Sequence, residues 1–176
     1  MPAKMGSPPE PSEAGPVGRE GAAERRNAAC VDEAALWFRR LRETSNDAFL
    51  PLFWDEHRYL VLKGGGGSGK SIFAGRKVLE RVTTEPGHRW LVCRKVGRTL
   101  RESCFEQLKN QAYEFYGEEI AHMPRGKGGD MTMRFRNGSE ILFTGLDDVE
   151  KLKSIYYVTG IWIEEASEVL ERDFNQ

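Results

Sequence analysis

The chain has 176 residues, of which 39% are hydrophobic and 30% are charged, and its formal net charge at pH 7 is −1. This composition is ordinary for a globular protein with a core of its own. The nearly neutral charge excludes a global attraction to a polyanion, so any contact with nucleic acid has to come from a local basic patch.

The cysteines and histidines give no sign of a metal site or of a disulfide framework. They are scattered and form no CxxC pair, at Cys30, Cys93, Cys104, His57, His88 and His122. The N-terminus has no apolar segment typical of a secretory signal, and the longest apolar runs are too short to cross a bilayer. We therefore expect reduced thiols, no zinc, and a soluble intracellular protein without a membrane partner.

The N-terminal part differs in composition from the remainder. Residues 1–30 are rich in Pro, Gly, Ala, Ser and Glu, with almost no large apolar residue, which predicts a disordered tail. We expect residues 31–176 to form one domain. It begins with a short amphipathic helix over Asp32–Glu43, followed by the aromatic segment Phe49–Trp54, which Pro51 interrupts.

A strand, a loop, a helix and a second strand are predicted next. Tyr59–Leu62 is a wholly apolar run, as expected of a strand buried on both faces, and a glycine loop follows it. We predict a helix over Lys70–Val82 and a second buried strand over Trp90–Cys93.

The most regular helical pattern covers Thr99–Tyr116. Thr99 and Glu102 have the spacing of a capping box, and Gly117 stands where the residue after a helix end is expected. The apolar residues of this helix recur at helical spacing and are interpreted as core.

The sequence pattern of the C-terminal third predicts a hairpin and a last strand. Asn137-Gly138 separates the runs Met131–Arg136 and Glu140–Thr144, which is a strong hairpin signal. Val158–Ile163 is the last predicted strand, and a helix is expected from about Ala166. Alternation of strands and helices predicts an α/β fold with a mostly parallel sheet, helices on both faces, and the hairpin as an antiparallel addition.

A phosphate-binding loop follows the first predicted strand and opens a helix. The pattern G-x-x-x-x-G-K-[ST] is matched by Gly64, Gly65, Gly66, Gly67, Ser68, Gly69, Lys70 and Ser71. Glycines let backbone N–H groups wrap phosphates, and the helix N-terminus adds partial positive charge. Lys70 is expected to reach the β- and γ-phosphates of ATP, and the Ser71 hydroxyl to bind Mg²⁺. The alternative is a flexible glycine linker with a chance lysine. The strand–loop–helix context favours a P-loop NTPase.

Two carboxylates end the last strand. Ile161–Ile163 runs directly into Glu164 and Glu165, and a strand of this kind lies beside the P-loop strand in P-loop ATPases. Glu164 is the candidate Mg²⁺ ligand and Glu165 the candidate base that polarises the attacking water. Considered alone, the pattern is better explained by two solvated acids at a helix start, where the helix dipole favours them. The P-loop upstream favours the catalytic interpretation, although the metal position more often carries Asp.

Four segments together resemble the phage terminase large subunit. They are YLVLKGGGGSGKS, WLVCRKVGRTLRESCFEQL, LFTGLDDVEKLKS and GIWIEEASE, and the resemblance covers Pro51–Gln176. It implies an ATPase motor that drives double-stranded DNA into the capsid in the host cytoplasm. It also implies a portal protein and a small terminase subunit as partners, and a homo-oligomeric ring of the full-length protein.

Two departures from that family bear on activity. Many terminases carry Arg where Gly66 stands, so a cis arginine finger is absent there. The chain also stops soon after the acidic strand, before the family's coupling motif and nuclease. We therefore expect an ATPase domain that is incomplete at its C-terminus, with weak or no turnover in isolation and no nuclease activity.

Other residues support weaker hypotheses. Arg94 is the best candidate among the cations after the second strand for a phosphate or DNA contact; the others are Lys95, Arg98 and Arg101. Arg125, Lys127 and Arg134 are interpreted as surface charge. Phe53, Trp54, Arg58 and Tyr59 precede the P-loop strand, and the aromatic residues among them are interpreted as core more than as adenine contacts. The segment from Gly145 to Ser154 matches the family without a physical account of its role.

Competing functions remain at this point. A helicase-like ATPase or a small-molecule kinase also uses a P-loop, although no lid rich in arginines is evident for a kinase. A non-enzymatic product that binds nucleotide without turnover is the third hypothesis.

Overall fold

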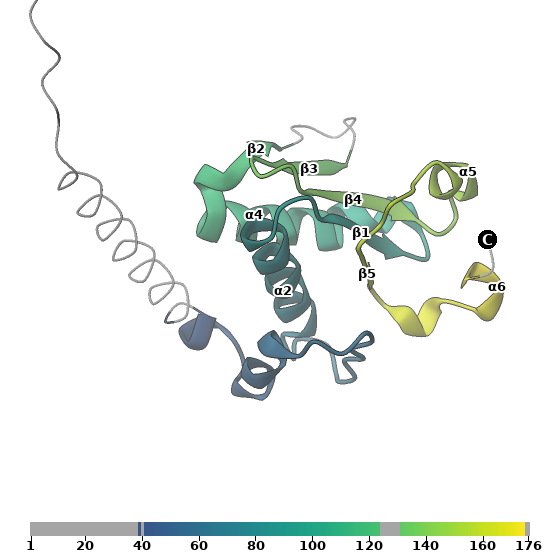
Figure 1. Ribbon diagram of the computed structural model, residues 1–176. Coiled ribbons are helices and arrows are strands. Elements are labelled where there is room, and N and C mark those ends of the chain that lie inside the picture. Colours follow the sequence, from purple (N-terminus) through teal and green to yellow (C-terminus); the bar gives the residue numbers. More distant parts are fainter. Residues whose placement is uncertain (1–38, 40, 124–130, 175–176) are drawn as a thin grey trace, which may run out of the picture. The chain divides into compact units, whose positions relative to one another are not determined.

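The computed structural model describes residues 39, 41–123 and 131–174 (Figure 1). The chain divides into two compact units, residues 1–43 and 44–176. In the first unit the described residues 39 and 41–43 are helical, in agreement with the C-terminal end of the predicted helix Asp32–Glu43. The predicted tail over residues 1–30 lies outside the described residues.

A mixed sheet forms the centre of the second unit. Its strands are β1 (Arg89–Arg94), β2 (Ile120–His122), β3 (Thr132–Phe135), β4 (Glu140–Gly145) and β5 (Gly160–Ile163). The order in space is β2-β3-β4-β1-β5. β1 pairs in parallel with β4 and β5, whereas β3 is antiparallel to both β4 and β2. The predicted parallel sheet with an added antiparallel hairpin is therefore confirmed.

The hairpin turn also stabilises the end of a helix. Gly138 has a φ of 85°, which the Asn-Gly signal anticipates because glycine enters the left-handed region without a steric penalty. The side-chain amide of Asn137 donates to the carbonyls of Val82 (2.9 Å), Thr83 (3.2 Å) and Glu85 (3.3 Å). Its carbonyl oxygen accepts from the Ser139 N–H at 3.0 Å. One side chain thus shapes the β3–β4 turn and caps the helix that ends at Thr84.

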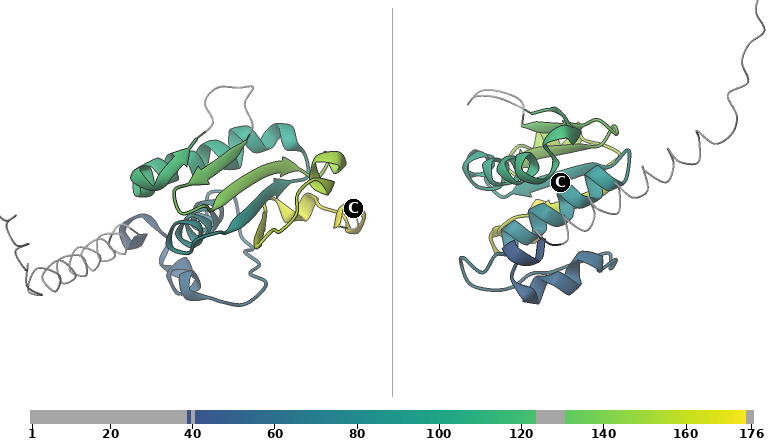
Figure 2. Two further views of the ribbon diagram at one scale, coloured as in Figure 1. Left: turned by 45° about the horizontal axis from the view of Figure 1, so that its top comes forward. Right: turned by 90° about the vertical axis from the view of Figure 1, so that its left-hand side faces the viewer.

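Two long helices and several short ones accompany the sheet. They are η1 (Asp47–Trp54), α2 (Lys70–Thr84), α3 (Gly97–Leu100), the π-helical η2 (Arg101–Phe105), α4 (Glu106–Tyr116), η3 (Gly117–Glu119), α5 (Val149–Lys153), η4 (Ala166–Glu168) and α6 (Glu171–Phe174). α3, η2 and α4 follow one another without a break, so together they form the predicted helix. α2 and α4 pack against each other (Figure 1, Figure 2).

The main core lies between these two helices and one face of the sheet. Alternate strand residues face the helices, since successive side chains of a strand point to opposite faces. The cluster includes Leu79, Leu108, Val92, Phe143 and Trp162. Leu79, Leu108 and Val92 have no accessible surface, which is typical of a close-packed interior.

The opposite face of the sheet is covered differently. Thr132 and Leu142 line a cavity there together with Lys151, Ser154 and Ile155, from α5 and the loop that follows it. Helical structure therefore reaches both faces, although the long helices share one of them. Within the described residues, no helix has the length and apolar character needed to cross a membrane.

The predicted strand over Tyr59–Leu62 is wrong. This run has no secondary structure, and Tyr59 and Val61 are 76% and 88% exposed. A strand is stable only when its backbone groups pair with a neighbour. β5 has β1 on one side, and on its other side no described residues form a strand. The expectation that the acidic strand lies beside a P-loop strand is corrected for the same reason.

Two helix boundaries also differ from the predictions. The helix expected from Thr99 begins at Gly97, with Val96 at the N-cap, and the Thr99 hydroxyl donates back to the Val96 carbonyl at 2.9 Å. Gly117 is not a left-handed helix end: its φ is −51°, and the chain continues into the 3-10 turn η3.

Candidate functional site

The phosphate loop is built from glycines that hold an open backbone. Gly67 and Gly69 have φ values of 73° and 87°, which side-chain-bearing residues rarely adopt. A Cβ placed on Gly65, Gly66 or Gly67 would meet no atom within 4 Å, so the loop backbone faces open space. α2 begins directly after it, at Lys70, with its N-terminus at the loop. The loop therefore offers the backbone donors and the helix end that a phosphate group requires.

Lys70 lies inside this loop. Its ammonium donates to the carbonyls of Gly64 (2.9 Å) and Gly65 (2.8 Å) and to the Ser68 hydroxyl (3.0 Å). Three donors meet three neutral acceptors, and within the described part of the chain the charged group forms no ion pair. Phosphate oxygens are stronger acceptors for an ammonium than these neutral groups. The side chain is thus placed to exchange loop contacts for phosphate contacts.

Ser71 and Glu164 are in direct contact, although they are far apart in sequence. The Ser71 hydroxyl donates to the Glu164 carboxylate at 2.6 Å, and the indole N–H of Trp162 donates to the second carboxylate oxygen at 3.1 Å. The P-loop and the acidic strand end therefore meet, as the sequence predicts. A hydroxyl and a carboxylate oxygen are ligands that Mg²⁺ prefers, and Mg²⁺ commonly takes few protein ligands beside substrate phosphates. The donor set fits this ion, and no larger cluster of potential ligand side chains occurs among the described residues.

Glu165 follows in an unusual backbone conformation. Its φ and ψ are both 50°, in the left-handed region, and its side chain is exposed. Such a conformation costs a residue other than glycine on the order of 1–2 kcal/mol. The turn directs the chain away from β5 into η4 immediately after the acidic pair. Strained backbone at a candidate catalytic residue is a recognised feature of functional sites.

Arg94 lies at the carboxyl end of β1 and pairs with an acid that the sequence analysis did not single out. Its Nη2 donates to the Glu168 carboxylate at 3.2 Å, and this hydrogen bond raises the pKa of the Arg94 guanidinium. Lys95, the next residue, lies 3.9 Å from the Asp173 carboxylate. The basic pair after β1 is thus matched by acids that follow β5.

The remaining candidate cations and aromatics have other surroundings. Arg101 lies over the Phe105 ring at 5.5 Å, and Arg134 lies 3.7 Å from Glu140, which leaves Arg134 as the expected surface charge. Arg125 and Lys127 lie outside the described residues. Phe53 is buried against Phe73, at 4.8 Å between ring centroids.

Exposed aromatic surface nevertheless occurs upstream of the loop. Trp54 is 61% exposed, and Arg58 lies over the exposed Tyr59 ring at 5.5 Å. Of the aromatic candidates, Phe53 therefore belongs to the interior, whereas Trp54 and Tyr59 do not.

Lys77 is a structural residue that the sequence analysis missed. Its ammonium donates to the carbonyls of Leu52 (2.7 Å), Phe53 (3.0 Å) and Asp55 (2.7 Å). Burial lowers the pKa of this lysine. Because Lys77 is two helical turns after Lys70, α2 fixes both the end of η1 and the glycine loop through lysine–carbonyl contacts. Helical spacing alone gave no signal for these partners.

The segment from Gly145 to Ser154, which matches the family, contacts the turn between β1 and α3. Asp147 accepts from the Gly97 N–H at 2.9 Å, Leu146 N–H donates to the Arg94 carbonyl at 2.9 Å, and Asp148 caps α5 by accepting from Lys151 N–H at 3.1 Å. A Cβ on Gly145 would approach Gly97 N to 2.3 Å, so the two turns pack backbone to backbone. The segment holds the β1–α3 turn in place.

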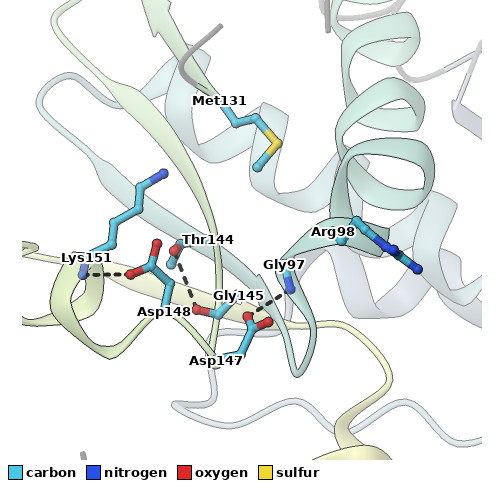
Figure 3. Close-up of a pocket in the computed structure, with 8 residues that line it drawn as sticks. All are labelled: Gly97, Arg98, Met131, Thr144, Gly145, Asp147, Asp148 and Lys151. Atoms are coloured by element: carbon cyan, nitrogen blue, oxygen red, sulfur yellow. Dashed lines mark hydrogen bonds between the residues drawn. The ribbon is translucent and has the colours of Figure 1, made fainter. Parts of the chain in front are cut away.

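A cavity of about 380 Å³ lies beside this contact (Figure 3). Its lining residues are Gly97, Arg98, Met131, Thr144, Gly145, Asp147, Asp148 and Lys151. Both carboxylates are engaged by backbone N–H groups, and the Arg98 side chain points away from the others (Figure 3). The residues that line this cavity therefore hold the strand ends in place and do not form a second ligand site.

Comparison with known proteins decides the family. The model for the phage terminase large subunit matches residues 56–176, which include the P-loop, the β1–α4 region and the acidic strand end. The chain belongs to the phage terminase large subunit family.

Characterised relatives agree with this membership. The PBSX phage terminase large subunit of Bacillus subtilis (strain 168) is 36% identical over 121 residues, which cover 69% of this chain. The terminase large subunit of Bacillus phage SPP1 is 36% identical over 118 residues, or 64% of this chain. In each case the match spans 27% of the relative's length.

A solved structure supports the fold. The large terminase from a thermophilic bacteriophage superimposes with a TM-score of 0.51 at 15% identity, over 64% of this chain and 28% of that protein. At this identity the likeness concerns the fold alone, which is the P-loop α/β fold that the sequence predicts.

Proposed function

We propose that this terminase chain contains the ATP-binding and hydrolysing module of a viral DNA-packaging motor, which drives double-stranded DNA into the capsid. The observation that carries the proposal is the 2.6 Å hydrogen bond between Ser71 of the P-loop and Glu164 of the acidic strand end. This hydrogen bond joins the P-loop to the acidic strand end, two motifs that have complementary roles in ATP chemistry.

Each residue at this point has a role in the proposal. The loop from Gly64 to Ser71 binds the phosphates, with Lys70 at the β- and γ-phosphates. Ser71 and Glu164 hold Mg²⁺, which neutralises charge on the phosphates when bound. Glu165 orients and deprotonates the attacking water.

Charge on the γ-phosphate also needs a guanidinium. Gly66 stands where many members of the family carry Arg, so the loop itself offers none. Arg94, at the end of β1, is the candidate within this chain. An arginine at the transferred phosphate contributes on the order of a thousandfold or more to phosphoryl transfer. A nucleotide-binding chain with slow or no turnover is the alternative that Gly66 favours.

The partners follow from family membership and are part of the proposal. They are double-stranded DNA, a portal protein, a small terminase subunit and further copies of the large subunit in a ring, in the host cytoplasm. Because the match spans 27% of each curated relative's length, these belong to the activity of the whole packaging protein.

Binding of nucleotide tests the central step. We expect the chain to bind MgATP, and Lys70→Ala to weaken this affinity about a hundredfold or more, because it removes a charged donor at the β- and γ-phosphates. Isothermal titration calorimetry measures both. Lys109→Ala, which removes the same charge from α4, is the matched control and should bind as the wild type does. Equal affinity of folded Lys70→Ala and wild type would refute the site.

The catalytic assignment needs a second variant. Glu165→Gln keeps the shape of the side chain but not its basicity, so we expect bound ATP without turnover. Glu164→Gln should instead reduce the dependence of ATP affinity on Mg²⁺. Phosphate release at wild-type rates by Glu165→Gln, in a longer homologous chain with robust turnover, would transfer the role of base to another residue.

A further inference from the structure

Two ion pairs join the end of β1 to the segment that follows the acidic strand. Arg94 reaches Glu168 of η4 at 3.2 Å, and Lys95 reaches Asp173 of α6 at 3.9 Å. The first pair is the closer of the two and includes a hydrogen bond. Arg94 is also the candidate catalytic cation, so the acid that holds it bears on the chemistry.

The sheet register places Arg94 beside the candidate metal ligand. Cys93 pairs with Ile163 in the parallel β1–β5 ladder, and the Glu164 N–H donates to the Cys93 carbonyl at 2.8 Å. One step further along both strands, Arg94 stands next to Glu164. Neighbouring strands are about 4.8 Å apart, so Arg94 leaves the backbone one strand spacing from the residue that contacts Ser71. An arginine side chain is longer than this spacing, so the register is compatible with a contact between Arg94 and a group bound at the P-loop.

The turn after β5 brings Glu168 back to the strand ends. Glu165, in the left-handed conformation, begins this turn, and the Glu168 N–H closes it by donating to the Glu165 carbonyl at 2.9 Å. Glu168 and Glu165 thus belong to one short unit. The backbone that presents the candidate base also presents the partner of Arg94.

The guanidinium of Arg94 is only partly satisfied by Glu168. One terminal nitrogen, Nη2, donates to the carboxylate, while Nε is buried and has no hydrogen-bond partner among the described residues. A guanidinium carries five donors in a planar fork and binds oxyanions best when its orientation is fixed. Glu168 holds one terminal nitrogen of the fork, and Nε is inaccessible to a ligand, so the donors left for a second oxyanion are those of the terminal nitrogens.

We propose that Glu168 is a positioning residue: it holds Arg94 at the ends of β1 and β5 so that the remaining donors of the terminal nitrogens meet the γ-phosphate of ATP. This rests on the proposed function, because it assigns a partner to a residue of the same site. Glu168 touches no phosphate in this arrangement, and its effect passes entirely through Arg94. ADP, which lacks the γ-phosphate, is insensitive to it.

The test compares two nucleotides on variants of the chain. Affinities for the magnesium complexes of ATPγS and ADP are measured by calorimetry for wild type, Glu168→Ala, Arg94→Ala and the double variant. We expect Glu168→Ala to weaken ATPγS about three- to tenfold, because a freed arginine must lose more rotamer entropy on binding. ADP affinity should not change, and Glu168→Ala should add nothing in the Arg94→Ala background. Glu168→Asp, which keeps the charge, should recover part of the loss.

Controls separate the possible failures. Asp173→Asn removes the neighbouring ion pair to Lys95 and should leave the ATPγS-to-ADP ratio as in the wild type; thermal melting checks that every variant is folded. If the wild type binds neither nucleotide, the proposed function fails. If the wild type binds both, but Glu168→Ala leaves the ratio unchanged, raises ATPγS affinity, or acts equally in the Arg94→Ala background, the positioning role is overturned and the nucleotide site stands.

Discussion

The two neighbours of the central strand β1 differ in how extensively they pair with it and in how deeply their side chains are buried. On the β4 side, six residue pairs form the ladder, and Phe143 is buried against Phe105 with ring centroids 5.1 Å apart. On the β5 side, four residue pairs form the ladder, and Ile161 is 57% exposed. The candidate metal ligand, the candidate base and Glu168 all follow β5.

The tighter packing therefore lies on the β4 side, and the candidate catalytic residues lie on the β5 side. Side chains at a nucleotide site must exchange partners, so they cannot be fixed as firmly as a core. The β4 side supplies the firm part, including the Asp147–Gly97 contact that holds the turn after β1. β1 belongs to both sides, and Arg94 therefore stands at the end of a strand that the core holds in place.

The largest expected difference between the β4 and β5 sides is the loss of unfolding free energy when an apolar side chain is truncated to alanine. Phe143→Ala should reduce the free energy of unfolding by about 3–5 kcal/mol, because it leaves a cavity in a close-packed region. Ile161→Ala on β5 should cost about 1 kcal/mol or less, since much of that side chain is already in water. Urea denaturation of both variants measures the contrast. Similar losses would show that the β5 side is as firmly packed as the β4 side.

A smaller effect is expected where β5 is tightly packed. A Cβ on Gly160 would lie 2.6 Å from the Trp90 ring, which packs against the main core. Gly160→Ala should therefore cost about 1–3 kcal/mol through overpacking. Trp90→Phe removes part of the obstructing ring, so the double variant should lose less than the sum of the two single changes. Strict additivity in urea denaturation would mean that the two residues do not compete for space.

The smallest effect has the opposite sign. Glu165→Gly should raise the free energy of unfolding by about 0.5–1 kcal/mol, because glycine adopts the left-handed conformation without steric cost. It should also abolish turnover wherever Glu165 is the base. Ser167→Gly, within the adjoining 3-10 turn, serves as control and should be slightly destabilising. A loss of stability in Glu165→Gly would indicate that its side chain, more than its backbone, holds the turn.

Much of the fold was predictable because its signals are local. The Lys70–Thr84 helix, β1 and the Asn-Gly hairpin each follow from spacing or turn chemistry within a few residues. The meeting of the P-loop with Glu164 was predictable too, since the two motifs have complementary chemistry. The assignment of catalytic roles to Lys70, Glu165 and Arg94 stays a prediction.

The remainder depends on contacts that no local pattern encodes. Tyr59–Leu62 has the composition of a buried strand, but strand formation needs a neighbour, and composition does not say which segment supplies it. Lys77 finds three carbonyls and Arg94 finds Glu168 only after the chain has folded. Each of these partners is separated from its cation by more than 20 residues along the chain.

The Asn137 side chain limits which residues this turn tolerates. Asparagine and aspartate are near equivalents in Asn-Gly and Asp-Gly hairpins, because both accept a backbone N–H and both tolerate the left-handed region. Here only asparagine is suitable: its amide donates to three carbonyls at the end of α2, and a carboxylate has no hydrogen to donate. With aspartate at this position, the negatively charged carboxylate would repel the carbonyl oxygens to which the asparagine amide donates. Asparagine and aspartate are therefore equally suitable for the hairpin turn, but only asparagine stabilises the C-terminal end of α2. The N-terminal end of the same helix begins at the phosphate loop.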